Sequence, residues 1–150
     1  MRGRSGKVMI TRKGEVGLEQ LLDELRPYSG EFGAIVIFMG VVRSLGCNGS
    51  KVRKLSYECY EEVAIESMER VRREVMEEFK GVKEILINHV VDDLEPGEEI
   101  MHVLVAAEHR DEAFRAAREA VERVKREVQI WKKEITEKGE HWISYKGPLT

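Results

Sequence analysis

The chain has 150 residues, of which 42% are hydrophobic and 35% are charged, and this length favours a single domain with one buried core. Its 25 Lys and Arg residues against 28 Asp and Glu residues give a net charge of -3, which excludes the general basic excess of a nucleic-acid-binding protein. No apolar run approaches the roughly 20 residues that span a bilayer, and the first residues lack the apolar stretch of a signal peptide. We expect one cytoplasmic domain over residues 1–150, with a flexible tail over residues 1–7.

The first third of the chain predicts two strands with a short helix between them. Residues 7–11 favour a short strand, and leucines at helical spacing predict a helix over residues 17–25. The run 33–42 is apolar and β-branched almost throughout, which is typical of a central strand covered on both faces. Arg43 follows this strand at once, and residues 44–50 form a glycine-bearing loop that we expect to be mobile and exposed.

The middle of the chain predicts three strands and a long helix. Imperfect alternation favours a strand over residues 52–60, and helical spacing of apolar residues predicts a helix over residues 61–79. A strand over residues 82–89 follows. A Pro-Gly turn at residues 94–98 then leads into a buried strand over residues 100–107.

The last third predicts a helix followed by two short strands. The helix opens at residues 109–112 with Asp111 as its N-cap, and it buries a stripe of alanines and valines. Residues 130–135 and 141–145 favour two closing strands. The element order is βαββαββαββ, which predicts either a two-layer α+β domain or an α/β sheet with a small β appendage. We interpret the chain as α+β: a two-layer sheet-and-helix domain with an additional small antiparallel β subdomain.

Two lysines near the end of the last helix are candidate functional residues. If the helix continues to Lys132, Lys125 lies about two turns away on the same face. If the helix stops near Val128, Lys132 falls on a strand face opposite Trp131. Either geometry aims two ammonium groups at one pocket, where they could bind an anion, transfer a proton or attack a carbonyl. The alternative is that both lysines only solvate a charged surface.

Further cations follow the predicted strands. Arg43 ends one strand, and His109 and Arg110 come just after another, which is where α/β folds place ligand sites. The start of the last helix adds partial positive charge there. These residues and the two lysines predict a cationic pocket for a small phosphorylated or carboxylated substrate, although each arginine taken alone is typical of an exposed surface.

Other candidate residues carry weaker signals. Cys47 has no adjacent base, so we interpret it as an inert loop thiol, and its spacing from Cys59 indicates neither a disulfide framework nor a metal site. The four histidines also lack metal-ligand spacing, so we expect no metal. Tyr57 and Tyr60 could line a ligand surface or pack in the core.

An ordered set of short motifs extends from about residue 33 to residue 142. They are FMGVVR at 38–43, LSYECY at 55–60, GE at 97–98, HR at 109–110, AF at 113–114, Lys125, and IWKKE at 130–134. As an ordered set, these motifs resemble the catalytic (large) subunit family of molybdopterin synthase. The resemblance implies an α/β hammerhead-type fold and a homodimer of large subunits. It also implies a small ubiquitin-like subunit at each end of that dimer, giving a heterotetramer.

The same resemblance implies a sulfurtransferase of molybdenum cofactor biosynthesis. Its reaction converts cyclic pyranopterin monophosphate (precursor Z) to molybdopterin by inserting two sulfurs. No cofactor is implied, because the sulfur comes from a Gly-Gly thiocarboxylate at the C-terminus of the small subunit. The family's functional lysines correspond to Lys125 and Lys132, and its substrate-pocket positions correspond to Arg43, His109 and Arg110, some of which we expect to act across the dimer interface.

Two departures from the family pattern stand out. Gln129 occupies a position where the family often has proline, which we expect to be tolerated, and residues 89–93 lack the usual arginine and glycine. We expect Ile130 and Trp131 to pack so that they hold Lys132 in place. The main alternative is a non-catalytic α+β assembly domain whose pocket binds an anion or other ligand. RNA binding is disfavoured by the acidic net charge and the lack of an aromatic RNA-binding motif.

Overall fold

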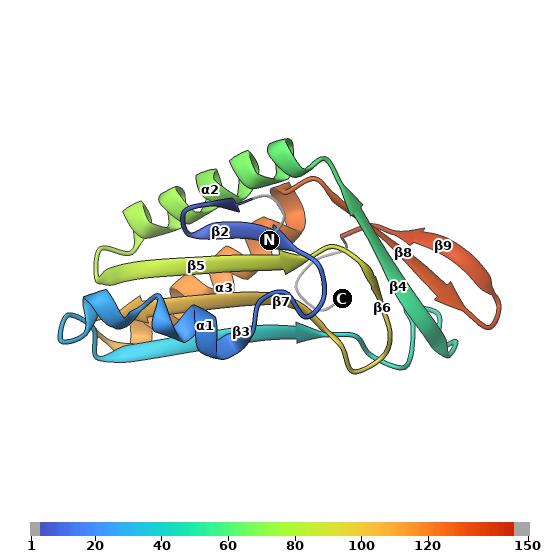
Figure 1. Ribbon diagram of the computed structural model, residues 1–150, viewed down its shortest axis with the longest axis horizontal. Coiled ribbons are helices and arrows are strands. Elements are labelled where there is room, and N and C mark those ends of the chain that lie inside the picture. Colours follow the sequence, from blue (N-terminus) through green and yellow to red (C-terminus); the bar gives the residue numbers. More distant parts are fainter. Residues whose placement is uncertain (1–3, 146–150) are drawn as a thin grey trace.

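The computed structural model describes residues 4–145 and arranges their strands in two sheets (Figure 1). The larger sheet has the order β1-β2-β5-β7-β3 and consists of β1 (Arg4–Ser5), β2 (Val8–Thr11), β5 (Val82–Val90), β7 (Glu99–Ala107) and β3 (Ala34–Val41). The smaller sheet has the order β6-β4-β8-β9 and consists of β6 (Asp93–Leu94), β4 (Val52–Cys59), β8 (Ile130–Thr136) and β9 (Gly139–Ile143). The predicted α+β fold with a small β subdomain is confirmed.

Helices cover both faces of the larger sheet. They are α1 (Leu18–Asp23), the 3-10 helix η1 (Arg26–Tyr28), α2 (Glu61–Glu78) and α3 (Arg110–Glu127). Figure 1 shows α3 behind the sheet and α1 in front of it. The buried stripes of α2 and α3 contribute to the main core, whereas Leu21 and Leu25 pack with Met9, Leu86 and Leu104 in a second cluster. The short α1 therefore adds a partial third layer to the two that the sequence predicts.

The strand β3 lies at the edge of the larger sheet rather than at its centre. Among the described strands it pairs only with β7, in antiparallel fashion. Val36 and Phe38 pack against the main core, but Ile35 and Ile37 remain 37% and 39% exposed. The prediction of a central strand covered on both faces is therefore wrong, because an apolar run does not reveal whether the same chain supplies its cover.

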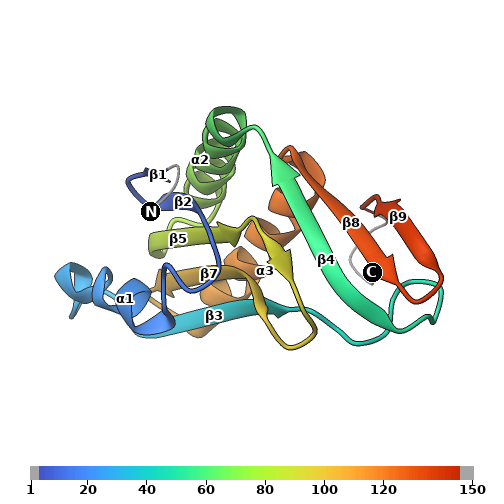
Figure 2. The same cartoon turned by 45° about the vertical axis from the view of Figure 1, so that its right-hand side comes forward.

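The smaller sheet stands across one end of the larger sheet (Figure 2). Its long pair is β4 with β8, which are antiparallel and place Tyr57 opposite Lys132. The inner residues Val52, Leu55 and Tyr57 are buried with the main core. The sheet therefore packs through one face and leaves the other face to solvent.

Two element boundaries differ from the sequence expectation. Arg4 and Ser5 pair with β2 as the short strand β1, so part of the expected 1–7 tail belongs to the sheet, while residues 1–3 lie outside the described residues. The N-cap of α3 is His109, with extended backbone angles, and Asp111 lies inside the first turn. The prediction of Asp111 as N-cap is therefore wrong, although a carboxylate in the first turn still offsets the helix dipole.

Candidate functional site

A pocket of about 390 Å³ opens between the two sheets at the C-terminal end of α3. Three cationic side chains line it, and they are Arg43, Lys125 and Lys132. Much of the remaining wall is apolar and includes Phe38, Val41, Leu55, Met101, Val124 and Ile143. Cations in an apolar wall favour a ligand that has both a flat or apolar body and an anionic group.

The two lysines reach the pocket from different elements. Because α3 ends at Glu127, Lys125 lies in its last turn and Lys132 lies on β8, so the second of the two predicted geometries is confirmed. Alternation along β8 turns Ile130 and Lys132 toward the pocket and Trp131 to the outer face. Trp131 instead packs edge-to-face on Tyr60, with 5.8 Å between ring centroids. The expectation that Trp131 holds Lys132 in place is therefore wrong.

The ammonium group of Lys132 is destabilised by its surroundings. Burial lowers its pKa below the usual value for lysine, and the positive charges of Lys125 and Arg43 act in the same direction. Cys47 and Glu134 oppose this change. A lysine with a lowered pKa gives up and regains a proton more readily near neutral pH, which suits proton transfer.

His89 forms a neutral part of the pocket wall. Burial lowers its pKa to about 4, opposed by a hydrogen bond to the Val90 carbonyl and reinforced by Lys132 and Lys125. The ring packs edge-to-face on Tyr57, with 5.2 Å between centroids. Burial also raises the pKa of Tyr57, so both side chains are uncharged at neutral pH. His89, whose role the sequence left open, therefore belongs to the pocket.

The glycine-bearing loop after β3 is tied to the small sheet. Leu45 bridges Lys51, and the Gly46 N–H donates a 2.8 Å hydrogen bond to the Ser50 carbonyl. A Cβ atom at Gly46 would clash with the carboxylate of Glu134, so a larger residue here would require that side chain to move. The loop thereby brings the free thiol of Cys47 into the pocket wall.

Glu134 is a site residue that the sequence interpretation missed. It is buried, lines the pocket two residues after Lys132, and has its Oε1 atom 3.6 Å from Nε2 of His141. In the sequence it reads as one more charge in the run KKE. The available signal was strand alternation, because residues two apart share a face and Lys132 had already been singled out.

His109 and Arg110 do not join the other cations within one chain. Both are exposed at the start of α3, and Arg110 lies about 22 Å along the helix axis from Lys125. The cause is the antiparallel pairing of β3 with β7, which puts the carboxyl ends of these strands at opposite ends of the sheet. Within one chain, His109 and Arg110 therefore lie apart from the pocket. The expectation that some of the five residues act across a dimer interface, and the roles of His109 and Arg110, stay predictions.

The unusual Gln129 has a structural partner. Its Oε1 atom accepts a 2.8 Å hydrogen bond from the hydroxyl of Ser67 on α2. Gln129 occupies the connection between α3 and β8, so this bond fixes the corner that separates Lys125 from Lys132. A glutamine at this position replaces the rigidity of a proline by a contact between elements.

Residues 4–145 show neither a membrane-spanning helix nor a cluster of metal ligands. No helix there is long and apolar enough to cross a membrane. No group of three His, Cys, Asp or Glu side chains in that range is placed to hold a metal ion. The chemistry that the described residues offer at this pocket is that of cationic, carboxylate and thiol side chains.

Comparisons with known proteins agree with one another. The MoaE protein family matches residues 12–127. A molybdopterin synthase catalytic subunit of Pyrococcus abyssi is 41% identical over 141 residues, which cover 94% of this chain and 93% of that protein. The crystal structure of molybdopterin synthase from Staphylococcus aureus has a TM-score of 0.81 at 30% identity, covering 95% of this chain and 100% of that one. A complex of subunits 1 and 2 of molybdopterin-converting factor from Helicobacter pylori shares the fold, with a TM-score of 0.71 at 20% identity over 93% of this chain and 92% of that one.

The low pKa of His89 predicts a loss of stability in acid. The pKa is about 4 in the folded protein against 6.5 for an ordinary histidine, so the unfolded chain takes up a proton first as the pH falls. The stabilisation is present above pH 6.5 and is lost as the pH falls toward 4. Between pH 7.5 and pH 4.5, His89→Gln should lose about 2 to 3 kcal/mol less of its free energy of unfolding than the wild type. Urea titrations at both pH values measure this, and equal losses in the two proteins would contradict it.

Proposed function

The chain belongs to the MoaE protein family, the catalytic subunits of molybdopterin synthase, and on this premise we propose that its cationic pocket converts cyclic pyranopterin monophosphate to molybdopterin. The observation that carries the proposal is the meeting of Arg43, Lys125 and Lys132 in a largely apolar pocket. The apolar wall suits the pterin ring, and the cations suit the cyclic phosphate. This pairing of surfaces matches a substrate that is flat at one end and charged at the other.

Sulfur reaches this pocket from the small ubiquitin-like subunit, and no cofactor takes part. Each of the two transfers takes one sulfur from the thiocarboxylate at the C-terminal Gly-Gly of the small subunit. The transfer converts that thiocarboxylate to a carboxylate. A thiocarboxylate tail is anionic, so the same cations that bind phosphate also attract the tail. The free thiol of Cys47 is then a neighbour of the reaction rather than its sulfur source.

The two lysines have separate roles in this proposal. Lys125 lies on the last turn of α3 and stabilises negative charge that develops on the tail and the substrate during sulfur transfer. Lys132 has the lowered pKa, so it is the group that gives and takes protons as the cyclic phosphate opens. Arg43 binds the phosphate, because a planar guanidinium can donate two parallel hydrogen bonds to its oxygens.

His109 and Arg110 take part through a second copy of the chain. The strand β3 has one free edge, and its residues Ile35, Ile37 and Val41 are exposed. A free edge of this kind can form backbone hydrogen bonds with the same strand of a second copy, in an antiparallel arrangement with two-fold symmetry. Such a pairing brings the start of one β3 beside the end of the other. The start of β3 pairs with the end of β7. In the dimer, His109 and Arg110 of the second copy therefore come close to Arg43 of the first. The homodimer thereby completes each pocket, and a small subunit at each pocket makes the heterotetramer.

We place the protein in the cytoplasm, which is supported by the exposed, free thiol of Cys47. The competing function, a non-catalytic domain that binds an anion in this pocket, predicts substrate binding without product. Turnover with a thiocarboxylated partner distinguishes the two.

Lys125→Ala is predicted to lose at least 100-fold in the single-turnover rate, because a charge-stabilising group is removed from the transition state. The assay mixes the protein with an excess of thiocarboxylated small subunit and cyclic pyranopterin monophosphate, and it measures molybdopterin. Cys47→Ala is the matched control, since it changes the same pocket wall and should keep the rate within about threefold of wild type. Full turnover by Lys125→Ala would contradict the role of the lysine, and no wild-type product would favour the anion-binding domain.

The shared pocket predicts complementation between two inactive variants. Lys125→Ala and Arg110→Ala should each be nearly inactive as homodimers. When equal amounts of the two variants are unfolded together and refolded, half of the dimers contain one chain of each kind. Each of these mixed dimers has one intact pocket out of two, so about one quarter of the wild-type activity should return. Single-turnover assays before and after mixing measure this return. If Arg110 served the pocket of its own chain, no pocket would be intact and no activity would return.

A further inference from the structure

One ring nitrogen of His89 has no hydrogen-bond partner among residues 4–145. His89 is 7% exposed and lines the pocket at the end of β5. Its Nδ1 atom lies 2.9 Å from the carbonyl oxygen of Val90, and the ring makes no other hydrogen bond or ion pair in this part of the chain. Since a carbonyl only accepts, a neutral ring has its proton on Nδ1. The Nε2 atom then carries a lone pair that can accept a hydrogen bond.

The surroundings of His89 hold its ring neutral and in one orientation. Burial lowers its pKa to about 4, and the positive charges of Lys132 and Lys125 act in the same direction, against the bond to Val90. The edge-to-face contact with Tyr57 and the bond to the backbone both restrict rotation of the ring. A protonated ring would donate from both nitrogens and accept nothing. At neutral pH, His89 is therefore an oriented acceptor in the pocket wall.

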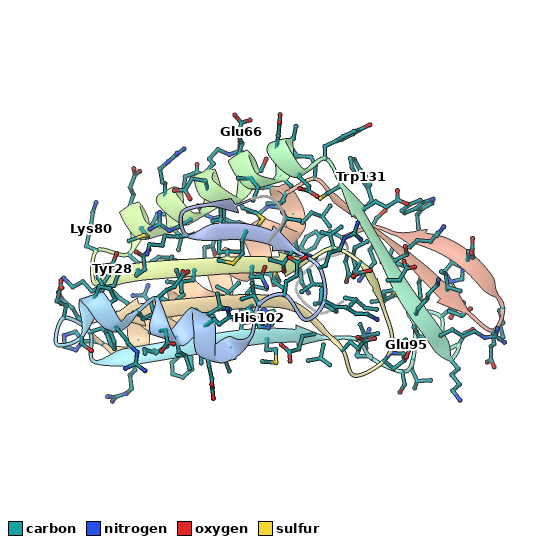
Figure 3. The ribbon with its side chains drawn as sticks, in the orientation of Figure 1. Tyr28, Glu66, Lys80, Glu95, His102 and Trp131 are labelled. Carbon is teal, nitrogen blue, oxygen red and sulfur yellow. The ribbon has the colours of Figure 1, made fainter. Side chains whose placement is uncertain are left out.

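A second buried histidine, His102 on β7, has partners at both ring nitrogens. It is 1% exposed, and Figure 3 shows it in the middle of the larger sheet. Its Nδ1 atom lies 3.1 Å from Nδ2 of Asn88, and its Nε2 atom lies 2.6 Å from Oε1 of Glu99. Buried polar groups are usually paired in this way. His89 departs from that rule at the one nitrogen that has no partner, and the pocket is the space beside it.

A neutral acceptor supplies what the charged groups of the pocket lack. The three cations of the pocket donate hydrogen bonds and cannot accept them. The carboxylate of Glu134 can accept, but it lies 3.6 Å from Nε2 of His141, and its negative charge opposes an anionic ligand. The imidazole of His89 accepts without repelling a phosphate. It therefore suits a ligand that carries both an anionic group and N–H donors.

We propose that Nε2 of His89 accepts a hydrogen bond from an N–H group of the substrate's pterin ring, so that His89 determines specificity for this heterocycle while the cations bind the phosphate. This inference rests on the proposed function, because that function supplies the pterin. A pterin has ring N–H and amino groups along its edge, and burying one of them unpaired in an apolar wall is unfavourable. His89 thereby distinguishes a pterin from other small phosphorylated molecules of similar charge.

The test measures the Kd of cyclic pyranopterin monophosphate by calorimetry, without the small subunit, so that no product forms. His89→Phe keeps an aromatic ring against Tyr57 but removes the acceptor, and it should raise the Kd by about tenfold or more. His89→Gln is the matched control, because its amide oxygen can replace Nε2 as the acceptor, and it should stay within about threefold of wild type. Inorganic phosphate tests the cations alone, and its Kd should stay within about twofold in both variants.

A second measurement uses the wild type and does not depend on the folding of His89→Phe. The nitrogen NMR signal of an imidazole nitrogen with a lone pair moves upfield when that nitrogen accepts a hydrogen bond. The Nε2 signal of His89, identified by its absence in His89→Gln, should move upfield with cyclic pyranopterin monophosphate and much less with inorganic phosphate. An unmoved signal at saturating substrate would overturn the proposal. So would a Kd for His89→Phe that equals the wild-type value, or an equal loss in His89→Gln.

The two proposals fail in different ways. If the wild type binds the substrate but gives no product with a thiocarboxylated partner, and His89→Phe still weakens binding, the role of His89 stands and the proposed function falls. Turnover by the wild type together with an unaffected Kd in His89→Phe removes the role of His89 alone. No binding of the substrate to the wild type removes both. If both stand, His89→Phe needs more substrate but keeps its single-turnover rate at saturation within about threefold of wild type, because the bond is made equally in the ground and transition states.

Discussion

The packing of the small sheet across the end of the large one determines the properties of the pocket. Leu55 and Tyr57 of β4 are buried against the main core, and this closes the apolar wall around Lys132. An ammonium group in such a place loses hydration, and Lys125 and Arg43 repel it further. A free energy cost is therefore present before any ligand binds. An anionic phosphate or thiocarboxylate offsets the lost hydration and the repulsion between the cations, and this increases the affinity of the pocket for such groups.

Antiparallel pairing in the large sheet separates the cations that the proposal assigns to the substrate. Since β3 runs against β7, Arg43 and the pair His109 and Arg110 leave the sheet at opposite ends, and α3 spans the distance between them. No loop of ordinary length could bring them together in one chain. In the proposed homodimer, two-fold symmetry about the β3 edge would place the end of β3 in one copy beside the beginning of β3 in the other. The proposal also gives a reason for the exposure of Ile35 and Ile37 on this edge strand, because a second copy would cover them.

Sequence reasoning succeeded where the signal was local. The stripes of α2 and α3, the turn at Gly97 and the alternation around Lys132 all follow from the spacing of neighbouring residues. It failed where the answer depended on distant partners. An apolar run such as β3 looks the same at the centre and at the edge of a sheet, and Glu134 looks like a solvated acid until Gly46 is seen to pack against it. The outward direction of Trp131 was implied by the alternation that turned Lys132 inward, but the expectation of packing overrode it.

The two faces of the strand β8 have different surroundings. Ile130, Lys132 and Glu134 line the pocket, while Trp131 faces outward. A shift of one residue in the pairing with β4 would exchange these faces, placing Trp131 in the pocket and Lys132 in solvent. The register is held by Ile130 in the core at one end and by Glu134 against Gly46 at the other. The contacts that orient Lys132 toward the pocket therefore also turn Trp131 outward, so both faces of β8 depend on one strand register.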